Sequence, residues 1–184
     1  MTITTLDPKT AVIVIDLVKG VLSYPTAHPV DGVLARAAAL VAAFRRRGLP
    51  VVLVNVTGRP PGRTEQSGSS GTLPADWAEF VPELDQQPTD HIVSKQSWGA
   101  FTNTDLEAYL RQRGVTQVVI LGVATSIGVE STARFAHELG FNVTLAIDAM
   151  TDTSAEAHAH SVERIFPRLG ETSAARDIID LLMR

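Results

Sequence analysis

The chain has 184 residues, of which 45% are hydrophobic and 20% charged, as is typical of a soluble globular protein. Its formal net charge of −4 argues against nucleic acid as a partner, because phosphate binding favours a basic face. The chain contains no cysteine, which excludes disulfides, thiolate metal ligands and a thiol nucleophile. We find no signal-peptide pattern and no run of about 20 apolar residues, so we expect a cytoplasmic protein that does not enter a membrane.

Short apolar runs alternate along the chain with amphipathic segments. The apolar runs are rich in β-branched residues, which is typical of buried strands, and they cover residues 10–17, 50–56, 91–95, 115–123 and 142–149. The amphipathic segments predict helices over residues 31–47, 104–113, 125–139, 153–165 and 173–183, with room for a short edge strand before the last. Thr104 with Glu107, and Thr153 with Glu156, have the spacing of capping boxes.

This alternation predicts a three-layer α/β/α sandwich around a mostly parallel sheet of five or six strands, in a single domain over residues 1–184. Ligands of such folds bind beyond the carboxyl ends of the strands. Polar residues at or near those ends are therefore candidates for a site: Asp16, Asn55, Lys95, Thr125 and Asp148. A long loop at about residues 57–90 is either a disordered insertion or a functional loop, and apolar residues in its second half indicate packing.

Taken singly, three candidate positions also have ordinary explanations. Asp16 follows the first strand, where a carboxylate either caps a turn or, among apolar neighbours, has a raised pKa. Lys95 ends the third strand, where a lysine commonly faces solvent. Gly128 lies in the first turn of the helix over residues 125–139, where backbone N–H groups favour negative charge but glycine is also simply tolerated.

Three segments together resemble the isochorismatase-like cysteine hydrolase family. They are IDLVKG after the first strand, HIVSKQSWGAFTNTDLEAYLRQRG, and LGVATSIGVESTARFAHELGFNVTLAIDAMTD, and they run in the family's order over most of the chain. The resemblance implies a hydrolase in which Asp16 and Lys95 occupy the positions of the family's catalytic aspartate and lysine. Gly128 occupies the position of its catalytic cysteine.

The same resemblance implies a cis peptide between Val123 and Ala124, just before Thr125, that directs backbone N–H groups at the substrate's developing negative charge. It also implies that the loop after the second strand supplies an arginine and a glutamine to the pocket. Arginine suits bidentate recognition of a carboxylate. The candidates in that loop are Arg59, Arg63 and Gln66, although loop arginines also commonly face solvent.

Two aromatic residues beside Lys95 are further candidates. Trp98 and Phe101 either form an apolar wall of the pocket or pack in the core. No metal is expected, because VNVTGRPPG after the second strand lacks the ligands of the family's zinc amidases. His158 and His160 are two residues apart on a predicted helix, so they face different directions and cannot chelate one ion together. No cofactor is expected either.

Glycine at position 128 offers no nucleophile. One branch of the family, the isochorismatases, also carries glycine there; its members hydrolyse a vinyl ether and release pyruvate. Resemblance to that branch implies that Asp16 protonates the enol-ether carbon and that water captures the oxocarbenium ion. Burial raises the pKa of Asp16 while the Lys95 ammonium lowers it, and a substrate carboxylate paired with Lys95 would favour protonated Asp16.

The turn itself, GVATSIG, and the residues after it are closer to the cysteine hydrolases, so two other hypotheses stay open. One is an impaired member, natural or engineered, that binds a small ligand without turnover. The other is an amidase-type hydrolase that uses water, with Asp16 as general base, since the Thr125 and Ser126 hydroxyls lack an evident base. In each case the partner is a small molecule. We expect a homodimer or homotetramer, because family members commonly form them.

Overall fold

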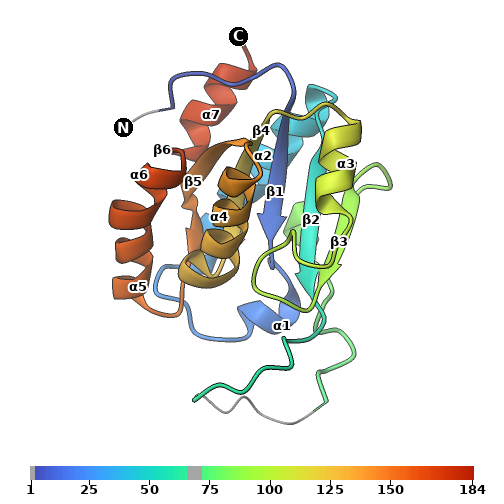
Figure 1. The fold of residues 1–184 in the computed structure, drawn as a ribbon, viewed down its shortest axis with the longest axis vertical. Coiled ribbons are helices and arrows are strands. Elements are labelled where there is room, and N and C mark those ends of the chain that lie inside the picture. Colours follow the sequence, from blue (N-terminus) through green and yellow to red (C-terminus); the bar gives the residue numbers. More distant parts are fainter. Residues whose placement is uncertain (1–2, 66–71) are drawn as a thin grey trace.

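Six strands form one sheet with the order β3-β2-β1-β4-β5-β6, in which every neighbouring pair is parallel. The computed structural model describes residues 3–65 and 72–184. The strands are β1 (Thr10–Ile15), β2 (Val51–Val56), β3 (His91–Lys95), β4 (Gln117–Val123), β5 (Asn142–Thr151) and β6 (Glu171–Ser173). The predicted parallel α/β/α sandwich is confirmed, with the short edge strand β6 as its sixth strand (Figure 1).

Helices cover both faces of this sheet (Figure 1). Their bounds are α1 (Lys19–Leu22), α2 (Val30–Arg46), η1 (Pro82–Leu84), α3 (Leu106–Gln112), η2 (Thr125–Val129), α4 (Glu130–Glu138), α5 (Ala155–His160), η3 (Ser161–Ile165), α6 (Phe166–Leu169) and α7 (Ala175–Leu182). Helices α2 and α7 pack on one face, whereas α3, α4 and α6 pack on the other. None of the helices in the described ranges has the length and apolar character needed to cross a membrane.

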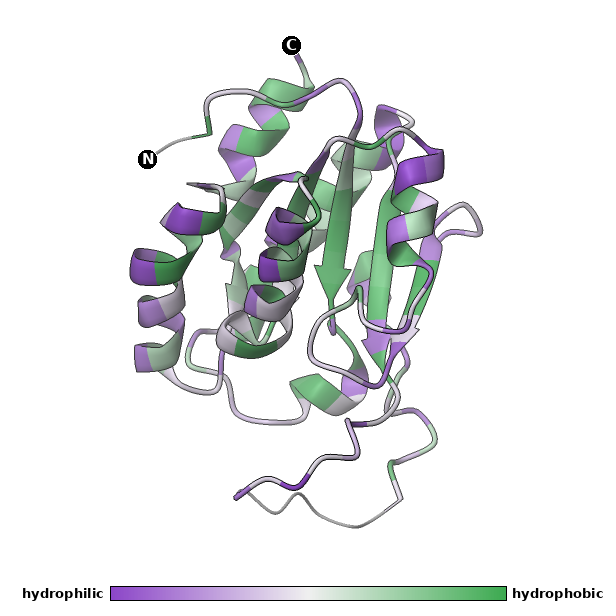
Figure 2. Ribbon diagram, in the orientation of Figure 1, coloured by the Kyte–Doolittle hydropathy of each residue, from purple (hydrophilic) through white to green (hydrophobic). Residues whose placement is uncertain are grey.

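The central strand explains why the core has two halves. β1 is buried along its whole length, because its side chains alternate between two covered faces. Val12 and Val14 join the core under α2 and α7, whereas Ile13 and Ile15 pack toward α3 and α4. Figure 2 shows the same division, with strands that are hydrophobic almost throughout and helices that mix hydrophobic and hydrophilic residues.

The strand order places a switch point beside β1, because β2 extends the sheet on one side and β4 on the other. Near this point β4 approaches β1 very closely. A Cβ atom on Gly122 would lie 2.0 Å from the carbonyl oxygen of Ile15, and Gly122 has φ +123°, so this position requires glycine. The peptide bond that follows β4, between Val123 and Ala124, is cis.

Two predicted helices begin differently in the structure. The segment predicted as a helix from residue 125 starts as the wide π-helical turn η2, and the regular helix α4 begins only at Glu130. The segment predicted as a helix from residue 153 starts at Ala155 as α5 and continues through the second π-helical turn η3. The short helix α1 had no periodic pattern and was not predicted.

Both predicted capping boxes are wrong by one residue. The Thr104 hydroxyl accepts the backbone N–H of Leu106, so it does not reach Glu107. At α5 the N-cap is Ser154, whose hydroxyl accepts the N–H of Ala157. Because Asp152 accepts the N–H of Ser154, the chain turns one residue later than the capping-box spacing suggested.

The second half of the long loop packs on the rest of the fold, as its apolar residues indicated. Phe80 forms an antiparallel bridge with Val18, and Trp77 lies against α1, where a Cβ on Gly20 would be 2.3 Å from its ring. The Trp77 indole N–H also donates to the carbonyl of Val56 at the end of β2. The long loop is therefore anchored beside the carboxyl ends of the strands.

Candidate active site

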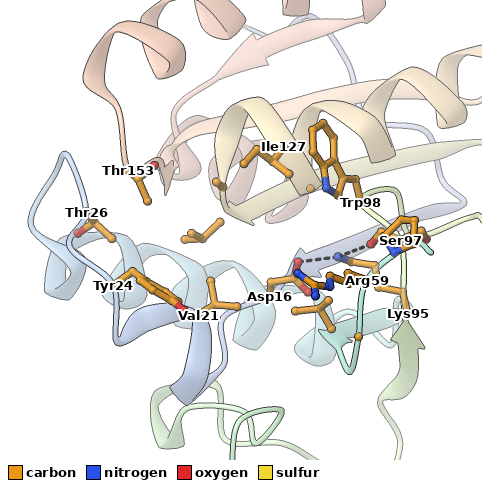
Figure 3. A pocket seen from close by; sticks show the side chains of 16 residues that line it. Asp16, Val21, Tyr24, Thr26, Arg59, Lys95, Ser97, Trp98, Ile127 and Thr153 are labelled. Carbon is orange, nitrogen blue, oxygen red and sulfur yellow. Dashed lines mark hydrogen bonds and ion pairs between the residues drawn. The ribbon is translucent and has the colours of Figure 1, made fainter. Parts of the chain in front are cut away.

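A buried carboxylate–ammonium pair lies at the carboxyl edge of the sheet. Lys95, the last residue of β3, donates hydrogen bonds from Nζ to Asp16 Oδ2 at 2.7 Å and to the carbonyl of Ser97 at 3.1 Å (Figure 3). Asp16 follows β1 with φ +51°, a left-handed conformation that aspartate tolerates better than most residues. Only 2% of the Lys95 side chain and 7% of the Asp16 side chain are exposed. The structure therefore brings together two residues that are 79 positions apart.

Burial determines the acidity of Asp16. Desolvation raises the pKa of its carboxyl from 3.8 to about 6, and the opposing charge and hydrogen bond of Lys95 only partly offset this effect. The second carboxyl oxygen, Oδ1, is buried and has no hydrogen-bond partner among the described residues. Asp16 can thus exchange a proton near neutral pH.

A cavity of about 270 Å³ adjoins this pair, close to the lower limit of small-molecule sites at about 300 Å³. Strand ends and the segments that follow them form its walls (Figure 3). The lining residues are Asp16, Val21, Tyr24, Thr26, Val56, Gly58, Arg59, Pro60, Lys95, Ser97, Trp98, Val123, Ala124, Ile127, Gly128 and Thr153. The cavity lies where the strand order reverses, the position at which open α/β sheets bind ligands.

Gly128 faces the pair from the turn η2. A Cβ atom at this position would lie 3.2 Å from Asp16 Oδ2 and 2.9 Å from Cγ2 of Ile15. The first distance places position 128 beside the carboxylate. The second is shorter than real Cβ contacts, so a side chain at position 128 requires a shift of the buried Ile15 or of the turn η2.

A second buried carboxylate, Asp152, holds the turn that carries Gly128. Its Oδ2 accepts two hydrogen bonds of 2.8 Å from Ser126, one from the backbone N–H and one from the hydroxyl. Sequence reasoning did not identify Asp152 as part of the site. Its position just after β5 could have identified it, because the ends of neighbouring parallel strands meet at one edge of the sheet.

Several residues predicted for the site lie elsewhere. Phe101 stacks on Phe141 and packs against the core, with ring centres 6.1 Å apart, so it does not form a cavity wall. Arg63 is exposed and does not line the cavity. Thr125 is buried and its hydroxyl bonds to His158 Nδ1 at 2.8 Å. Gln66 lies outside the described residues.

Two strand-end candidates have structural roles instead. Asn55 donates from its amide to the carbonyl of Ala78, which ties the long loop to β2. Asp148 accepts the backbone N–H of Ala175 at the start of α7 and pairs with Arg36. Neither lines the cavity. Strand position alone therefore does not separate residues of the site from residues that fix loops and helices.

Sequence reasoning also missed part of the cavity wall. Val21, Tyr24 and Thr26 belong to α1 and the segment after it, which has no periodic pattern. Ile127 belongs to the turn η2, where a regular helix was expected. In the described ranges, no three His, Asp or Glu side chains are grouped as metal ligands.

The chain is a three-layer α/β/α protein with a cavity at the carboxyl edge of its parallel sheet. The family model of the isochorismatase domain matches residues 10–177. The isochorismatase family protein YwoC of Bacillus subtilis, itself uncharacterized, is 41% identical over 182 residues, which cover 94% of this chain and 93% of YwoC. The chain belongs to the isochorismatase family, whose members are hydrolases.

Solved structures agree with this assignment. An isochorismatase family protein from Burkholderia thailandensis has a TM-score of 0.94 and 39% identity, with both chains covered completely. The N-carbamoylsarcosine amidase from Thermoplasma acidophilum has a TM-score of 0.77 and 25% identity, and the match covers 91% of this chain and 96% of the amidase.

Proposed function

We propose that this protein hydrolyses a small anionic vinyl ether of the isochorismate type and releases pyruvate, with Asp16 as the general acid. The observation that carries the proposal is the state of Asp16, which is buried at the cavity with its pKa raised to about 6. A general acid works best when its pKa lies near the operating pH. Position 128 is glycine, so the reaction has to proceed without a side-chain nucleophile there.

The proposed reaction uses one proton and one water molecule. The Asp16 carboxyl transfers its proton to the terminal vinyl carbon, where the electron pair of the double bond forms the new C–H bond. The resulting oxocarbenium ion lies beside the Asp16 carboxylate, which stabilises the positive charge. Water adds to the cation and returns a proton to Asp16. The hemiketal then breaks its bond to the ether oxygen, which takes up the proton of the hemiketal hydroxyl, and this gives an alcohol and the ketone of pyruvate.

A second candidate is amide hydrolysis by water. The similarity to N-carbamoylsarcosine amidase favours it, and ionised Asp16 would then act as the general base. The two candidates require opposite protonation states of the same carboxyl group. They can therefore be separated both by their products and by their dependence on pH.

The test is pyruvate release from isochorismate, followed by coupling to lactate dehydrogenase. We expect turnover by the wild type and its loss in Asp16→Asn. Asp31→Asn is the matched control, because Asp31 is an exposed aspartate on α2 and does not line the cavity. Circular dichroism of both variants checks that they fold. Full activity in Asp16→Asn would remove the acid role.

Isotopic labelling shows which bond breaks, and it requires no amino-acid substitution. In water enriched in oxygen-18, cleavage at the vinyl carbon leaves the original ether oxygen in the alcohol, so that product should be unlabelled. Label in the alcohol would mean attack on the other carbon and would contradict the mechanism. If isochorismate is inert while N-carbamoylsarcosine releases ammonia, the amidase candidate replaces the proposal.

A further inference from the structure

Two histidines that the proposed mechanism does not use are in contact beside the cavity. His28 belongs to the segment between α1 and α2, and His158 belongs to α5. Their ring centres lie 4.5 Å apart, with the rings tilted by 59°. Both residues are half-buried, and neither lines the cavity itself. Each histidine is bonded to a different part of the fold, and each contacts an element that carries cavity-lining residues.

His158 is bonded to the turn η2. Its Nδ1 lies 2.8 Å from the hydroxyl of Thr125, the first residue of that turn, and Thr125 is completely buried. Ile127 and Gly128 of the same turn line the cavity. A hydroxyl beside an imidazole resembles a nucleophile with its base. Because Thr125 is buried and does not line the cavity, a substrate does not reach it, and the bond serves to hold the turn.

His28 is bonded to the end of β5 and to the cavity wall. Its Nδ1 lies 3.0 Å from the Thr151 hydroxyl, and its carbonyl accepts the hydroxyl of Thr26 at 2.8 Å. Thr26 and Tyr24 line the cavity, and Figure 3 shows both on the same side of it. The contact between the two histidine rings therefore joins this wall, residues 24–28, to α5 and through it to the turn η2.

The charge on His158 decides whether both contacts persist. Within the described ranges, other elements present two titratable groups to it, His28 and Asp152, whereas η2 presents only the uncharged Thr125 hydroxyl. Burial and the neighbouring His28 lower the pKa of His158 from its ordinary value of 6.5, and the Asp152 carboxylate acts in the opposite direction. At pH 7 His158 is therefore predominantly neutral, and its Nδ1 can accept the Thr125 proton.

Protonation of His158 weakens both contacts. An imidazolium has no acceptor nitrogen, so the Thr125 hydroxyl loses its acceptor, and a charged His28 at 4.5 Å repels the imidazolium. A conformation in which the rings have separated exposes His158 to water, where its pKa returns toward 6.5. Because that conformation binds the proton more readily, its population grows as the pH falls below 6.5.

We propose that His158 is a positioning residue of the cavity, which in its neutral form holds residues 24–28 against the rest of the site and on protonation releases them. This role does not depend on which reaction the cavity carries out. Release removes the wall that Tyr24 and Thr26 form, so ligands should bind more weakly in acid. The effect falls on binding, whereas in the proposed mechanism the Asp16 proton acts on the chemical step.

The first test is an NMR titration of the free protein, which requires no substrate. As the pH is lowered from about 8 to about 5, we expect the His158 imidazole to titrate below pH 6.5. The backbone amide signals of Tyr24 and Thr26 should shift with the same midpoint. Midpoints that differ, or amide signals that do not respond, would overturn the proposal.

A His158→Asn variant separates the role of His158 from that of other titrating groups. Asparagine can hydrogen-bond to the Thr125 hydroxyl but cannot gain a charge, and Asp16 still titrates in this variant. We expect the pH-dependent shifts of residues 24–28 to be lost. His160→Asn is the matched control, because His160 is an exposed histidine on the same helix and does not line the cavity. Shifts that persist in His158→Asn, or that are lost in the control, would contradict the role of His158.

The second test separates binding from chemistry during turnover of isochorismate. Between about pH 7.5 and about pH 5.5 we expect KM to rise about threefold in the wild type and to stay constant in His158→Asn, since apparent affinity falls with the fraction of molecules in which the cavity is complete. The accompanying change in protonated Asp16 is larger, so kcat/KM still falls as the pH rises. An equal rise of KM in both proteins would count against the proposal. If isochorismate is not hydrolysed, the proposed function fails, and the NMR titration alone decides on His158.

Discussion

Lys95 at the end of β3 reaches past β2 and bonds to Asp16 at the end of β1, with Nζ 2.7 Å from Oδ2. Both side chains are almost completely buried, so each is the charge partner that makes burial of the other tolerable. The protonation state of Asp16 therefore depends on Lys95 as well as on pH. This relationship leads to two predictions about the pH dependence of activity.

We expect kcat/KM for pyruvate release to fall as the pH rises through about 6. In the proposed mechanism the active form carries the proton on Asp16, whose pKa is raised to about 6, and the protonated fraction falls about tenfold for each further pH unit. The measurement is a pH–rate profile at constant ionic strength. A profile that rises through the same range would show that Asp16 acts as a base, as the amidase candidate requires.

Replacing Lys95 should move this profile. Lys95→Met removes the charge that lowers the pKa of Asp16 and leaves the desolvation that raises it. We expect the apparent pKa of Asp16 to rise above 6, so that the decline begins at higher pH. A carbon-13 NMR titration of the Asp16 carboxyl measures the same shift even if turnover is lost. An unchanged or lower pKa would contradict the assigned cause.

Introducing cysteine at position 128 should not create an amidase by itself. In Gly128→Cys the Cβ meets Cγ2 of Ile15 at 2.9 Å, and overpacking of this kind destabilises a core by about 1–3 kcal/mol. Adding Ile15→Ala removes that methyl group and allows the thiol to sit beside Asp16. We expect ammonia release from N-carbamoylsarcosine only in the double variant. Efficient hydrolysis by the single variant would show that the turn adapts without help.

Trp98 and Phe101 should have separate effects, although they are close in the sequence. Trp98→Ala should raise KM roughly tenfold, because an exposed ring at the cavity mouth loses its contact with substrate, and kcat and stability should change little. Phe101→Ala should lower the free energy of unfolding by about 2 kcal/mol and leave KM unchanged, since its ring packs on Phe141. Urea unfolding and steady-state kinetics on both variants test this separation.

Replacing Asp152 should lower the free energy of unfolding more than replacing Ser126, the serine that it binds in the turn η2. Asp152→Asn weakens acceptance of the Ser126 N–H and hydroxyl, and we expect a loss of about 1–3 kcal/mol in the free energy of unfolding. Ser126→Ala removes only the hydroxyl contact and should cost about 1 kcal/mol. A double-mutant cycle should show positive coupling, because the residues share one contact. Independent effects would mean that the bond between the Ser126 hydroxyl and Asp152 contributes nothing to stability.

Much of the fold could be predicted because its signals are local. The apolar runs of β1, β2 and β3 coincide with strands, and alternation with helices implied a parallel sheet. The helix ends were less predictable, since Ser154 became the N-cap of α5 through a contact of its own backbone with Asp152. Serine and threonine are both preferred at N-caps, so the sequence pattern does not decide between the neighbouring Thr153 and Ser154.

The residues of the site could be predicted where polar side chains stand at strand ends. They could not be predicted where tertiary packing determines which side chains reach the cavity. Asp16 and Lys95 were identified from their positions after strands, and they do contact each other. The same rule also selected Asn55 and Asp148, which fix a loop and a helix. Tyr24 was missed because its segment has no periodicity and reaches the cavity only through the folded path of the chain.

The narrow gap at Gly128 also bears on how reactions diversify in this architecture. Asp16 and Lys95 are held by β1 and β3, whereas position 128 belongs to a separate turn after β4. In the proposed mechanism the group that handles the proton and the residue at position 128 are therefore encoded on different parts of the chain. The two parts still meet in the core, because a Cβ at position 128 would lie 2.9 Å from Cγ2 of Ile15, so a side chain introduced there has to be matched by an adjustment of that contact.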